Sequence, residues 1–375
     1  MNKNKNIKVC HLTSVHPPFD IRIFYKQCVS LVNAGYQVSL IAPINNPEIK
    51  KGVNIIPVKL PKHRLKRMLT VTTKMYRLAK RQNAAIYHFH DPELMFCAVL
   101  LRLSGRKVIF DIHENIRISL VSKDWLPKWL GKLLGAVYFV FERVALLFYH
   151  HLILAEESYM KYYPKKKSTV VLNYPLLVDI KVDSKDYSQH LQFVYSGVVH
   201  ALRGVWEMLE IVKRLKNNGF NIVLDLVGEV RPQGLNSQIK DFINKNSLES
   251  NINIVGKVDF SEVSLYLAKA HIGFSLLKPI PNYKESLPTK IFEYMQHGLP
   301  VITNNFNLYR EYVEDTETGI CVNIDNIEEM TNKIESLLKN RGRLKTMSVN
   351  GTEVIKGKYN WKSQEMNLLN VYDLI

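Results

Sequence analysis

The sequence contains little of what would mark a secreted or membrane-spanning protein. Its four cysteines, Cys10, Cys28, Cys97 and Cys321, are scattered and form no Cys-x-x-Cys pair, which predicts buried free thiols in a reducing compartment. No stretch of about 18 uncharged apolar residues occurs, so we expect no helix that spans a membrane. The N-terminus is polar and leads directly into a predicted strand, which predicts that there is no signal peptide. We therefore expect a cytoplasmic protein.

Low-complexity tracts, internal repeats and Asp-x-Asp motifs are also lacking. At 375 residues the chain is long for one domain and comfortable for two domains of ordinary size. An apolar content of 46% is enough to fill the cores of both. We therefore expect a globular protein of two domains.

Acidic residues are scarce in the first half of the chain. Residues 1–190 contain 30 Lys and Arg against 13 Asp and Glu, whereas the remainder contains 21 of each kind. The whole net charge of +17 therefore belongs to the N-terminal half. Such an asymmetry indicates an anionic partner there, which can be nucleic acid, a membrane surface or a phosphorylated substrate.

Strand and helix patterns alternate along the whole chain. Short apolar runs predict strands at 7–14, 37–42, 53–58, 85–89, 107–111, 152–155, 170–175, 193–197, 221–228, 252–256, 271–276, 299–303 and 319–322. This alternation predicts an α/β protein with two doubly wound, Rossmann-like sheets and a cleft between their strand ends. We expect the N-terminal domain at 1–178, a linker at 179–190 and the C-terminal domain at 191–358.

One stretch, residues 284–303, combines a loop, a helix and a buried strand. Pro288 suits the first turn of the helix. The free N–H groups at the helix start, the positive end of the helix dipole and the side chain of Lys290 together suit phosphate oxygens. Glu293 on the helix and Glu285 in the loop before it supply carboxylates that can accept sugar hydroxyls. Glutamates that are merely solvated fit this pattern equally well.

The same stretch resembles a known motif. Its Glu-x7-Glu spacing, which runs into Gly298-Leu299-Pro300-Val301-Ile302, is similar to the donor site of family-4 retaining glycosyltransferases, which have the GT-B fold. The resemblance implies that Glu293 holds the ribose hydroxyls of a nucleotide and that Glu285 contacts the transferred sugar. Residues 359–375 resemble the last helix of the family, which crosses back to the first domain.

The resemblance also implies how the donor diphosphate is held. Its ligands would be Lys290 and the backbone of Ser286, Leu287 and Thr289. The family carries a basic residue and a glycine, usually Lys-Gly, after a glycine loop of the second domain. Here Gly197 provides that loop and Arg203-Gly204 the basic pair. Because positive charge placed in advance stabilises charge that develops on the leaving phosphate, Arg203 and Lys290 are expected to be catalytic.

From the first domain, the family reaches the transferred sugar with a histidine at the end of a strand. His113 follows the predicted strand at 107–111 and is our candidate, although a histidine satisfied only by its neighbours fits as well. Glu114 beside it could orient the imidazole. At the end of the preceding strand, Asp91 is expected to cap the next helix. The role of His90 stays open.

The first loop of the chain departs from the family pattern. Many members have a glycine pair there, whereas this chain has no glycine and offers Asp20 and Arg22. Arg22 fits a phosphate contact, a capping role or an interdomain salt bridge. The sequence leaves that choice open.

Two segments of the basic half are candidates for contact with an anionic membrane. Residues 59–82 have apolar residues at helical spacing and Lys or Arg on the other face, which fits a solvated basic face or a lipid surface. Residues 123–132 combine tryptophans with lysines, as interfacial anchors do. The middle of the apolar segment that continues to residue 149 is expected to be a core helix.

The function expected on these grounds is a retaining glycosyl transfer from a nucleotide-diphosphate sugar. The expected acceptor is a saccharide or a polyprenyl-diphosphate-linked saccharide at the inner face of a membrane, as in surface-polysaccharide assembly. The lack of Asp-x-Asp agrees with a leaving group stabilised without a metal, so we expect no metal and no cofactor besides the donor. The alternatives are a GT-B nucleotide-sugar epimerase, a non-enzymatic basic protein at a membrane surface, and a nucleic-acid binder. No recognised nucleic-acid module supports the last, and we expect no nucleic-acid partner.

Overall fold

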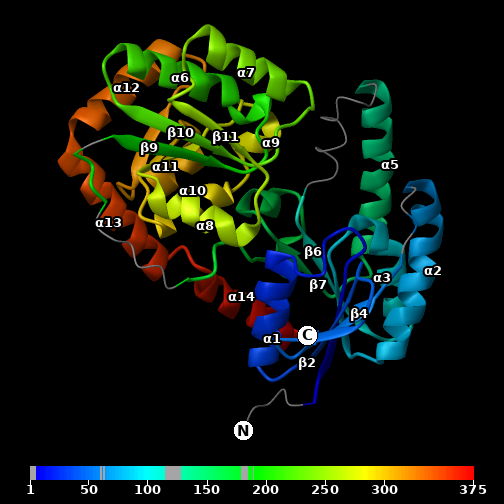
Figure 1. The fold of residues 1–375 in the computed structure, drawn as a ribbon. Coiled ribbons are helices and arrows are strands. Elements are labelled where there is room, and N and C mark those ends of the chain that lie inside the picture. The colour runs from blue at the N-terminus through cyan, green and yellow to red at the C-terminus, as the bar shows by residue number, and fades with distance from the viewer. Residues whose placement is uncertain (1–5, 60, 62–63, 115–127, 179–184, 189) are drawn as a thin grey trace. The chain divides into compact units, whose positions relative to one another are not determined.

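The computed structural model describes residues 6–59, 61, 64–114, 128–178, 185–188 and 190–375 (Figure 1). The chain forms two compact units. Unit 1 contains the residues up to Asn173 together with Trp361–Ile375, and unit 2 contains Tyr174–Asn360. Each unit has a β-sheet covered by helices, so each can be described by itself.

Unit 1 is built on an eight-stranded sheet with the order β3-β4-β2-β1-β5-β6-β7-β8. Its strands are β1 (Lys8–Leu12), β2 (Gln37–Ala42), β3 (Glu48–Lys50), β4 (Val53–Pro57), β5 (Ile86–Phe89), β6 (Lys107–Ile112), β7 (His151–Leu154) and β8 (Ser168–Val170). All neighbouring strands are parallel except the pair β3 and β4, which is antiparallel. The short β3 at the edge escaped prediction because its three residues include two charged ones.

Helices lie on both faces of the unit 1 sheet. They are the π-helix η1 (Ile21–Cys28) with α1 (Val29–Asn33), α2 (Arg64–Gln82), α3 (Met95–Leu103), α5 (Lys128–Leu146) and α14 (Trp361–Leu374), and short 3-10 turns occur at Pro92–Leu94, Glu157–Lys161 and Lys165–Lys167. Alternate side chains of β1 and β5 point to opposite faces of the unit 1 sheet. Leu12 and Phe89 enter the apolar core beneath α2 and α3, whereas His11 and His88 meet Tyr372 of α14 on the other face.

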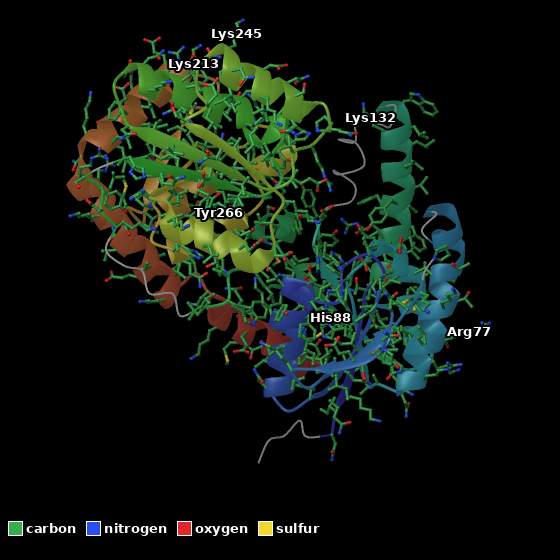
Figure 2. The ribbon with its side chains drawn as sticks, viewed as in Figure 1. Arg77, His88, Lys132, Lys213, Lys245 and Tyr266 are labelled. Atoms are coloured by element: carbon green, nitrogen blue, oxygen red, sulfur yellow. The ribbon has the colours of Figure 1, made fainter. Side chains whose placement is uncertain are left out.

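Unit 2 is built on a six-stranded parallel sheet with the order β11-β10-β9-β12-β13-β14. Its strands are β9 (Leu191–Ser196), β10 (Ile222–Val227), β11 (Ile252–Gly256), β12 (Ile272–Ser275), β13 (Val301–Asn304) and β14 (Gly319–Val322). Its helices are η5 (Ala201–Arg203), α6 (Val205–Asn217), α7 (Leu235–Lys245), α8 (Phe260–Lys269), α9 (Pro281–Lys284), α10 (Thr289–Gln296), α11 (Asn307–Val313), α12 (Ile327–Lys339) and α13 (Arg341–Gly357). Figure 2 shows their side chains, with Lys213 on α6, Lys245 on α7 and Tyr266 on α8.

The two sheets share one topology. In chain order, the parallel strands of unit 2 are arranged 3-2-1-4-5-6, and those of unit 1 follow the same order with one more strand at the end. The order reverses between β1 and β5 in unit 1 and between β9 and β12 in unit 2. Ligands of doubly wound sheets bind beyond the carboxyl ends of the strands at such a reversal. The prediction of two doubly wound α/β sheets is confirmed. Each unit therefore has one expected ligand position, at the reversal of its strand order.

The first helix and the linker differ from what the sequence predicts. The expected helix after the first loop begins at Ile21 as a π-helix, and the side chain of Asp20 caps it by accepting hydrogen bonds from the N–H groups of Arg22 and Ile23. Part of the expected linker is built into unit 2, because the Tyr187 side chain belongs to its core. Residues 179–184 and 189 lie outside the described residues.

The segment up to residue 149 also differs from expectation. Its middle was expected to lie in the core, but α5 turns Val137, Val140 and Val144 outward. The residues 123–127 of the expected anchor lie outside the described part of the chain. None of the helices in the described part of the chain combines the length and apolar content that crossing a bilayer requires.

Two glycines allow the loops after β9 and β10 to meet. Gly197 and Gly228 have φ angles of 124° and 148°, a region that L side chains adopt at a cost. A Cβ on Gly228 would lie 1.9 Å from the carbonyl oxygen of Gly197. The approach of these two backbones therefore excludes any side chain at position 228.

Replacing Gly228→Ala is expected to lower the free energy of unfolding of unit 2 by roughly 2–5 kcal/mol, since a strained φ adds to a backbone clash. Urea unfolding measures this. Gly234→Ala is the matched control, because a Cβ there meets nothing within 4 Å. Equal stability of the two variants would contradict the packing described here.

Candidate functional site

The candidate site of unit 2 lies where the order of its strands reverses. Strand β9 ends at Ser196 and passes into Gly197, and α10 begins at Thr289 after the loop that follows β12. Tyr294 of α10 bridges the two strands. Its hydroxyl accepts a hydrogen bond from the Ser196 N–H (3.0 Å) and donates one to the Phe274 carbonyl oxygen (3.1 Å). This anchor fixes α10 against the ends of β9 and β12.

The anchor brings two cations together over Gly197. A Cβ on Gly197 would lie 2.5 Å from Lys290 Nζ and 3.7 Å from Arg203 Nη1. Glycine is favoured here by its φ of 124°, and a side chain in its place would displace the end of Lys290. Lys290 Nζ also lies 5.5 Å from the centre of the Tyr195 ring, whose hydroxyl donates to the Val198 carbonyl oxygen at 2.8 Å. The structure thus gathers three of the predicted residues, Gly197, Arg203 and Lys290, at one point.

The charge state of Lys290 reflects this setting. Burial and the positive charge of Arg203 lower its pKa to about 8, and the charge of Glu293 acts in the opposite direction. Two cations held close at a strand end attract an anion of matching size, and the N-terminus of α10 adds its dipole. A diphosphate carries two or three negative charges and fits these requirements.

The remaining predicted residues occupy the loop and helix around Lys290. Glu293 is half-buried on α10, one turn after Lys290, and Thr289 is the first residue of the helix. Glu285 is exposed and follows the short helix α9. Leu287 is buried and Ser286 half-buried between the two helices. The arrangement of a carboxylate on the helix and another in the preceding loop is confirmed.

Unit 1 holds a second group of polar residues at its own reversal point. The carboxylate of Asp111, near the end of β6, is fully buried. Arg22 Nε and Nη2 donate to its two oxygens at 3.0 and 2.8 Å, and Gln27 Nε2 donates at 2.6 Å. His113 Nε2 lies 2.9 Å from Asp111 Oδ2. Arg22 Nη1 donates to the carbonyl oxygen of Val171, so this guanidinium is used within unit 1.

Asp111 is held as an anion. Burial raises its pKa, but the charge of Arg22 and the contacts with His113 and His90 outweigh burial and hold the pKa well below its usual value. This pairing explains the role of the Arg22 side chain, because its guanidinium is buried and bound to partners in the same unit. A phosphate contact and an interdomain salt bridge are therefore both wrong as interpretations of Arg22.

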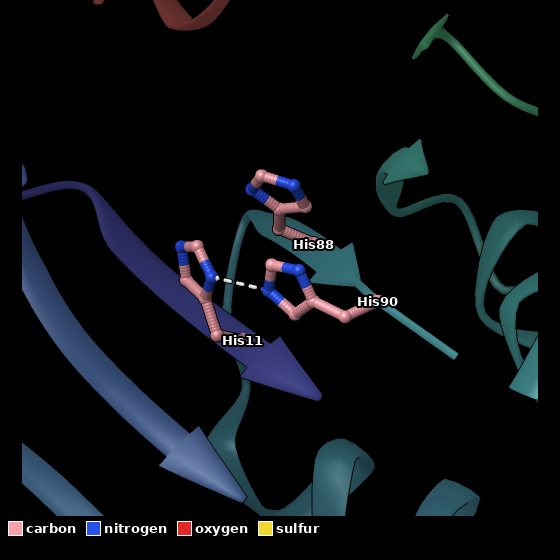
Figure 3. A group of neighbouring side chains, drawn as sticks. All are labelled: His11, His88 and His90. Atoms are coloured by element: carbon pink, nitrogen blue, oxygen red, sulfur yellow. Dashed lines mark hydrogen bonds between the residues drawn. The ribbon is translucent and has the colours of Figure 1, made fainter. Parts of the chain in front are cut away.

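Neutral imidazoles extend from this anion into the sheet. His90 Nδ1 lies 3.3 Å from Asp111 Oδ2, and His90 Nε2 lies 2.9 Å from His11 Nδ1 (Figure 3). The Tyr372 hydroxyl is 3.2 Å from His11 Nε2 and 2.7 Å from His88 Nδ1. Burial lowers the pKa of His11 and His88, and lowers that of His90 to about 3, so all three are uncharged.

The direction of the hydrogen bonds follows from the negative charge at one end of this chain. His90 Nδ1–H must donate to Asp111, which leaves His90 Nε2 to accept from His11 Nδ1–H. His11 Nε2 then accepts from the Tyr372 hydroxyl, whose oxygen accepts from His88 Nδ1–H. His113 uses its Nε2–H toward Asp111, so its proton lies on Nε2 and its Nδ1 is an acceptor.

Two groups of side chains bring possible metal ligands together. They are His11, His88 and His90, and His90, Asp111 and His113. The hydrogen bonds above use His11 Nδ1 and His90 Nε2 against each other, so those atoms are not both available to a cation. His88 Nε2 is buried without a hydrogen-bond partner. The donor set therefore fits a hydrogen-bonded chain better than a metal centre.

The structure corrects two expectations in unit 1. Asp91 stands at the N-cap position of the Pro92–Leu94 turn, but its side chain makes no capping hydrogen bond. It instead accepts from Thr13 Oγ1 (2.7 Å) and the Ser14 N–H (2.6 Å), and it pairs with His16. It thereby holds the loop after β1. Glu114 is exposed, and the residue that orients His113 is Asp111.

Sequence reasoning missed five polar residues of this cluster: His11, Gln27, His88, Asp111 and Tyr372. A signal for three of them was present. Polar residues alternate with apolar ones at His11-x-Thr13, His88-x-His90 and Asp111-x-His113, at the ends of three predicted strands. Because alternate residues of a strand share a face, these positions on neighbouring strands meet on one side of the sheet.

Matches to two protein families cover most of the chain. Residues 179–354 match the family described as glycosyl transferases group 1, and residues 22–166 match the glycosyl transferase 4-like domain. The first match lies largely in unit 2 and the second in unit 1. The chain therefore contains one glycosyltransferase family domain in each unit.

Solved structures of glycosyltransferases share the fold along nearly the whole chain. Sucrose-phosphate synthase from Thermosynechococcus elongatus has a TM-score of 0.76 at 16% identity, with 98% of each chain covered. HepE from Anabaena, solved in complex with UDP, has a TM-score of 0.71 at 10% identity and covers 98% of this chain and 100% of its own. The fold is therefore GT-B, as the resemblance implied.

A curated relative agrees with this class. An uncharacterized glycosyltransferase of Methanocaldococcus jannaschii is 26% identical over 208 residues. The match covers 56% of this chain and 54% of the relative, so the chain spans about half the length of that protein.

The pKa of Lys290 makes anion binding depend on pH. A bound anion favours the protonated amine, so the affinity for inorganic pyrophosphate should fall as pH rises above about 8. Between pH 7 and 9 we expect a loss of up to about tenfold relative to Lys290→Arg, which stays charged throughout. Calorimetry of both proteins measures this, and the titration of pyrophosphate itself cancels in the ratio. Parallel pH profiles would contradict the role of Lys290.

Removal of the Arg22 side chain should destabilise unit 1. Arg22→Met leaves Asp111 as an uncompensated buried charge and is expected to lower the free energy of unfolding by about 3–5 kcal/mol. Arg22→Lys keeps the charge without the two-pronged contact and should cost less. Urea unfolding compares both with Arg231→Gln, which removes an exposed ion pair and should leave the midpoint unchanged. Wild-type stability of Arg22→Met would refute the pairing.

Proposed function

We propose that this protein is a retaining glycosyltransferase that moves a sugar from a nucleotide-diphosphate sugar to a saccharide or lipid-linked acceptor. The observation that carries the proposal is the convergence of Lys290 and Arg203 over Gly197 at the reversal point of unit 2. The family matches support the reaction class. Structures of HepE with UDP and with UDP-glucose support a nucleotide-sugar donor.

The diphosphate is proposed to lie between the two cations and the start of α10. Arg203 presents a planar fork to phosphate oxygens, and Lys290 adds a second charge. The N–H groups around Ser286, Leu287 and Thr289 donate to the remaining oxygens. As the glycosidic bond to phosphate breaks, negative charge grows on the leaving diphosphate, and these fixed donors stabilise it. Neutralisation by side chains makes a metal unnecessary in this proposal.

The two glutamates are proposed to hold the ends of the donor. Glu293, one turn after Lys290, accepts the two ribose hydroxyls. Glu285 accepts hydroxyls of the transferred sugar. His113 is proposed to act on the same sugar from unit 1, with Nδ1 as an acceptor for a donor hydroxyl because Asp111 fixes the proton on Nε2. No general base is assigned, since the departing phosphate can take the proton of the acceptor hydroxyl.

The acceptor is proposed to be bound by the basic half of the chain. A polyprenyl-diphosphate-linked saccharide carries negative charge and resides at a membrane, which suits 30 Lys and Arg against 13 Asp and Glu in residues 1–190. The protein would then work in the cytoplasm at the inner face of the membrane, in surface-polysaccharide assembly. WaaG, described as a glycosyltransferase involved in lipopolysaccharide biosynthesis, supports this role with a TM-score of 0.70 at 15% identity, with 97% of this chain and 99% of WaaG covered.

The alternative functions explain fewer of the features of unit 2. A nucleotide-sugar epimerase would act on the donor without an acceptor, and it would not need the pair Glu285 and Glu293. A purely structural protein at a membrane, or a binder of nucleic acid, would not need two cations gathered over Gly197. The salt dependence of filter binding tests the last of these.

Thermal shift against UDP-, GDP-, ADP- and dTDP-sugars is expected to give one preferred donor. Its shift should be lost in both Glu293→Ala and Arg203→Ala, since the first removes the ribose contact and the second a diphosphate contact. We expect the affinity to fall at least about tenfold in each, the effect of losing a charge-assisted pair.

Lys245→Ala is the control, because Lys245 is exposed on α7 and Figure 2 shows it directed to solvent. Its donor shift should equal that of the wild type. A donor that binds Glu293→Ala and Arg203→Ala unchanged would overturn the assignment of the site.

A further inference from the structure

Helix α5 exposes a stripe of large apolar side chains that nothing in the described part of the chain covers. Large apolar side chains point outward at Trp129 (69% exposed), Leu133, Val137 (60%), Val140 (62%) and Val144. At about 100° of rotation per residue these five positions fall within an arc of about 80°. Leu134 and Phe141, both exposed, widen the stripe on one side.

Besides Ala145 and Leu146, which enter the apolar core, the inward face of α5 carries small and polar residues. Gly131 and Gly135 are buried there, and Glu142 is 6% exposed. Its carboxylate accepts hydrogen bonds from the hydroxyls of Tyr138 and Tyr163, both at 3.0 Å. An ionisable group that is turned into the protein while five large apolar groups are turned out indicates an apolar surrounding on the outer side.

Neighbouring helices extend this surface and give it a charge. Helix α3 packs against both α5 and α2, and it exposes Phe96 and Leu103. Helix α2 buries Val71, Met75 and Ala79 and exposes the basic side chains of Lys74, Arg77, Lys80 and Arg81. Figure 2 shows Lys132 on α5 and Arg77 on α2. The three helices contain one acidic residue, Glu142, and it faces inward.

We propose that the outer face of α5, from Trp129 to Val144, inserts into the headgroup region of an anionic bilayer, with Lys132 and the exposed cations of α2 on lipid phosphates. The stripe is about 22 Å long at 1.5 Å per residue, which suits a helix that lies in the plane of the surface. This proposal rests on the proposed function in that it names the surface that brings the enzyme to a membrane-bound acceptor.

Charge distinguishes lipid from a second copy of the chain as the occupant. A symmetric pair through this face would place two surfaces of the same sign together, including the cations of α2, and like charges across an interface cost free energy. An anionic bilayer offers hydrocarbon for the stripe and phosphate for the cations at the same time.

The test uses the full chain and extruded vesicles of phosphatidylcholine, with or without phosphatidylglycerol as the anionic lipid. Co-sedimentation should show binding to the anionic vesicles that weakens with salt. The triple variant Val137→Gln, Val140→Gln, Val144→Gln should bind at least about tenfold less, because it removes apolar contact from three side chains. Leu265→Gln changes an exposed apolar residue of unit 2 and should bind like the wild type.

A fluorescence measurement tests the same proposal with single substitutions. The four native cysteines are buried, so a fluorophore sensitive to polarity can be attached at Val140→Cys and, separately, at Leu265→Cys. Anionic vesicles should shift the emission to the blue at position 140 and leave it unchanged at 265. Absence of a shift at 140, or undiminished binding by the triple variant, overturns the proposal.

Donor binding by thermal shift separates this proposal from the proposed function. The triple variant should keep the donor shift of the wild type, which also shows that it is folded. If sedimentation equilibrium gives a dimer that the triple variant dissociates, while vesicles are not bound, a second copy occupies this face and the lipid proposal is wrong. If vesicles bind as expected but no donor does, the proposed function fails and the membrane surface stands.

Discussion

Unit 1 depends on one buried negative charge. Asp111 cannot be hydrated, and an isolated carboxylate in such a place would cost far more than the fold can supply. Arg22 compensates it and at the same time binds the carbonyl oxygen of Val171. Three segments that are remote in sequence are thereby fixed to one another: the first helix, the end of β6 and the chain that follows β8. The orientation of His113 is a result of the same charge.

In unit 2 the electrostatic cost comes from two neighbouring positive charges. Lys290 and Arg203 repel each other, and burial adds to the cost, as the lowered pKa of Lys290 indicates. The hydrogen bonds of Tyr294 fix α10 in place, and the absence of a side chain at Gly197 leaves room for both cations. A bound anion would offset this repulsion, which is the physical basis for proposing the diphosphate site here.

Most strands could be predicted from the sequence, but only some residues of the two polar clusters could. Strand positions followed from apolar runs, and the position of β2 was predicted to the residue. Gly197, Arg203 and Lys290 were predicted from local motifs, and the structure brings the three together. Asp111 was overlooked because its role is set by Arg22, 89 positions away, and no local pattern reports such a partner.

Two errors have a common physical origin. Asp91 fits an N-cap by sequence, but the loop after β1 offers N–H and hydroxyl donors that compete for its carboxylate. Helix α5 fits a core helix by composition, but composition does not tell which face a neighbour covers. In both cases the decisive partner is supplied by tertiary structure, which overrides local preference.

The course of the chain has a consequence for how the protein is made. The chain leaves unit 1 after Asn173 and returns at Trp361, where Trp361 donates to Ser30 and Tyr372 contacts His11 and His88. On the ribosome, all of unit 2 therefore emerges before the helix that completes unit 1. Domains generally fold as units during synthesis, but here the second unit is complete first. A chain that ended at residue 360 would contain all of unit 2, together with a first sheet whose buried imidazoles lack their phenol partner.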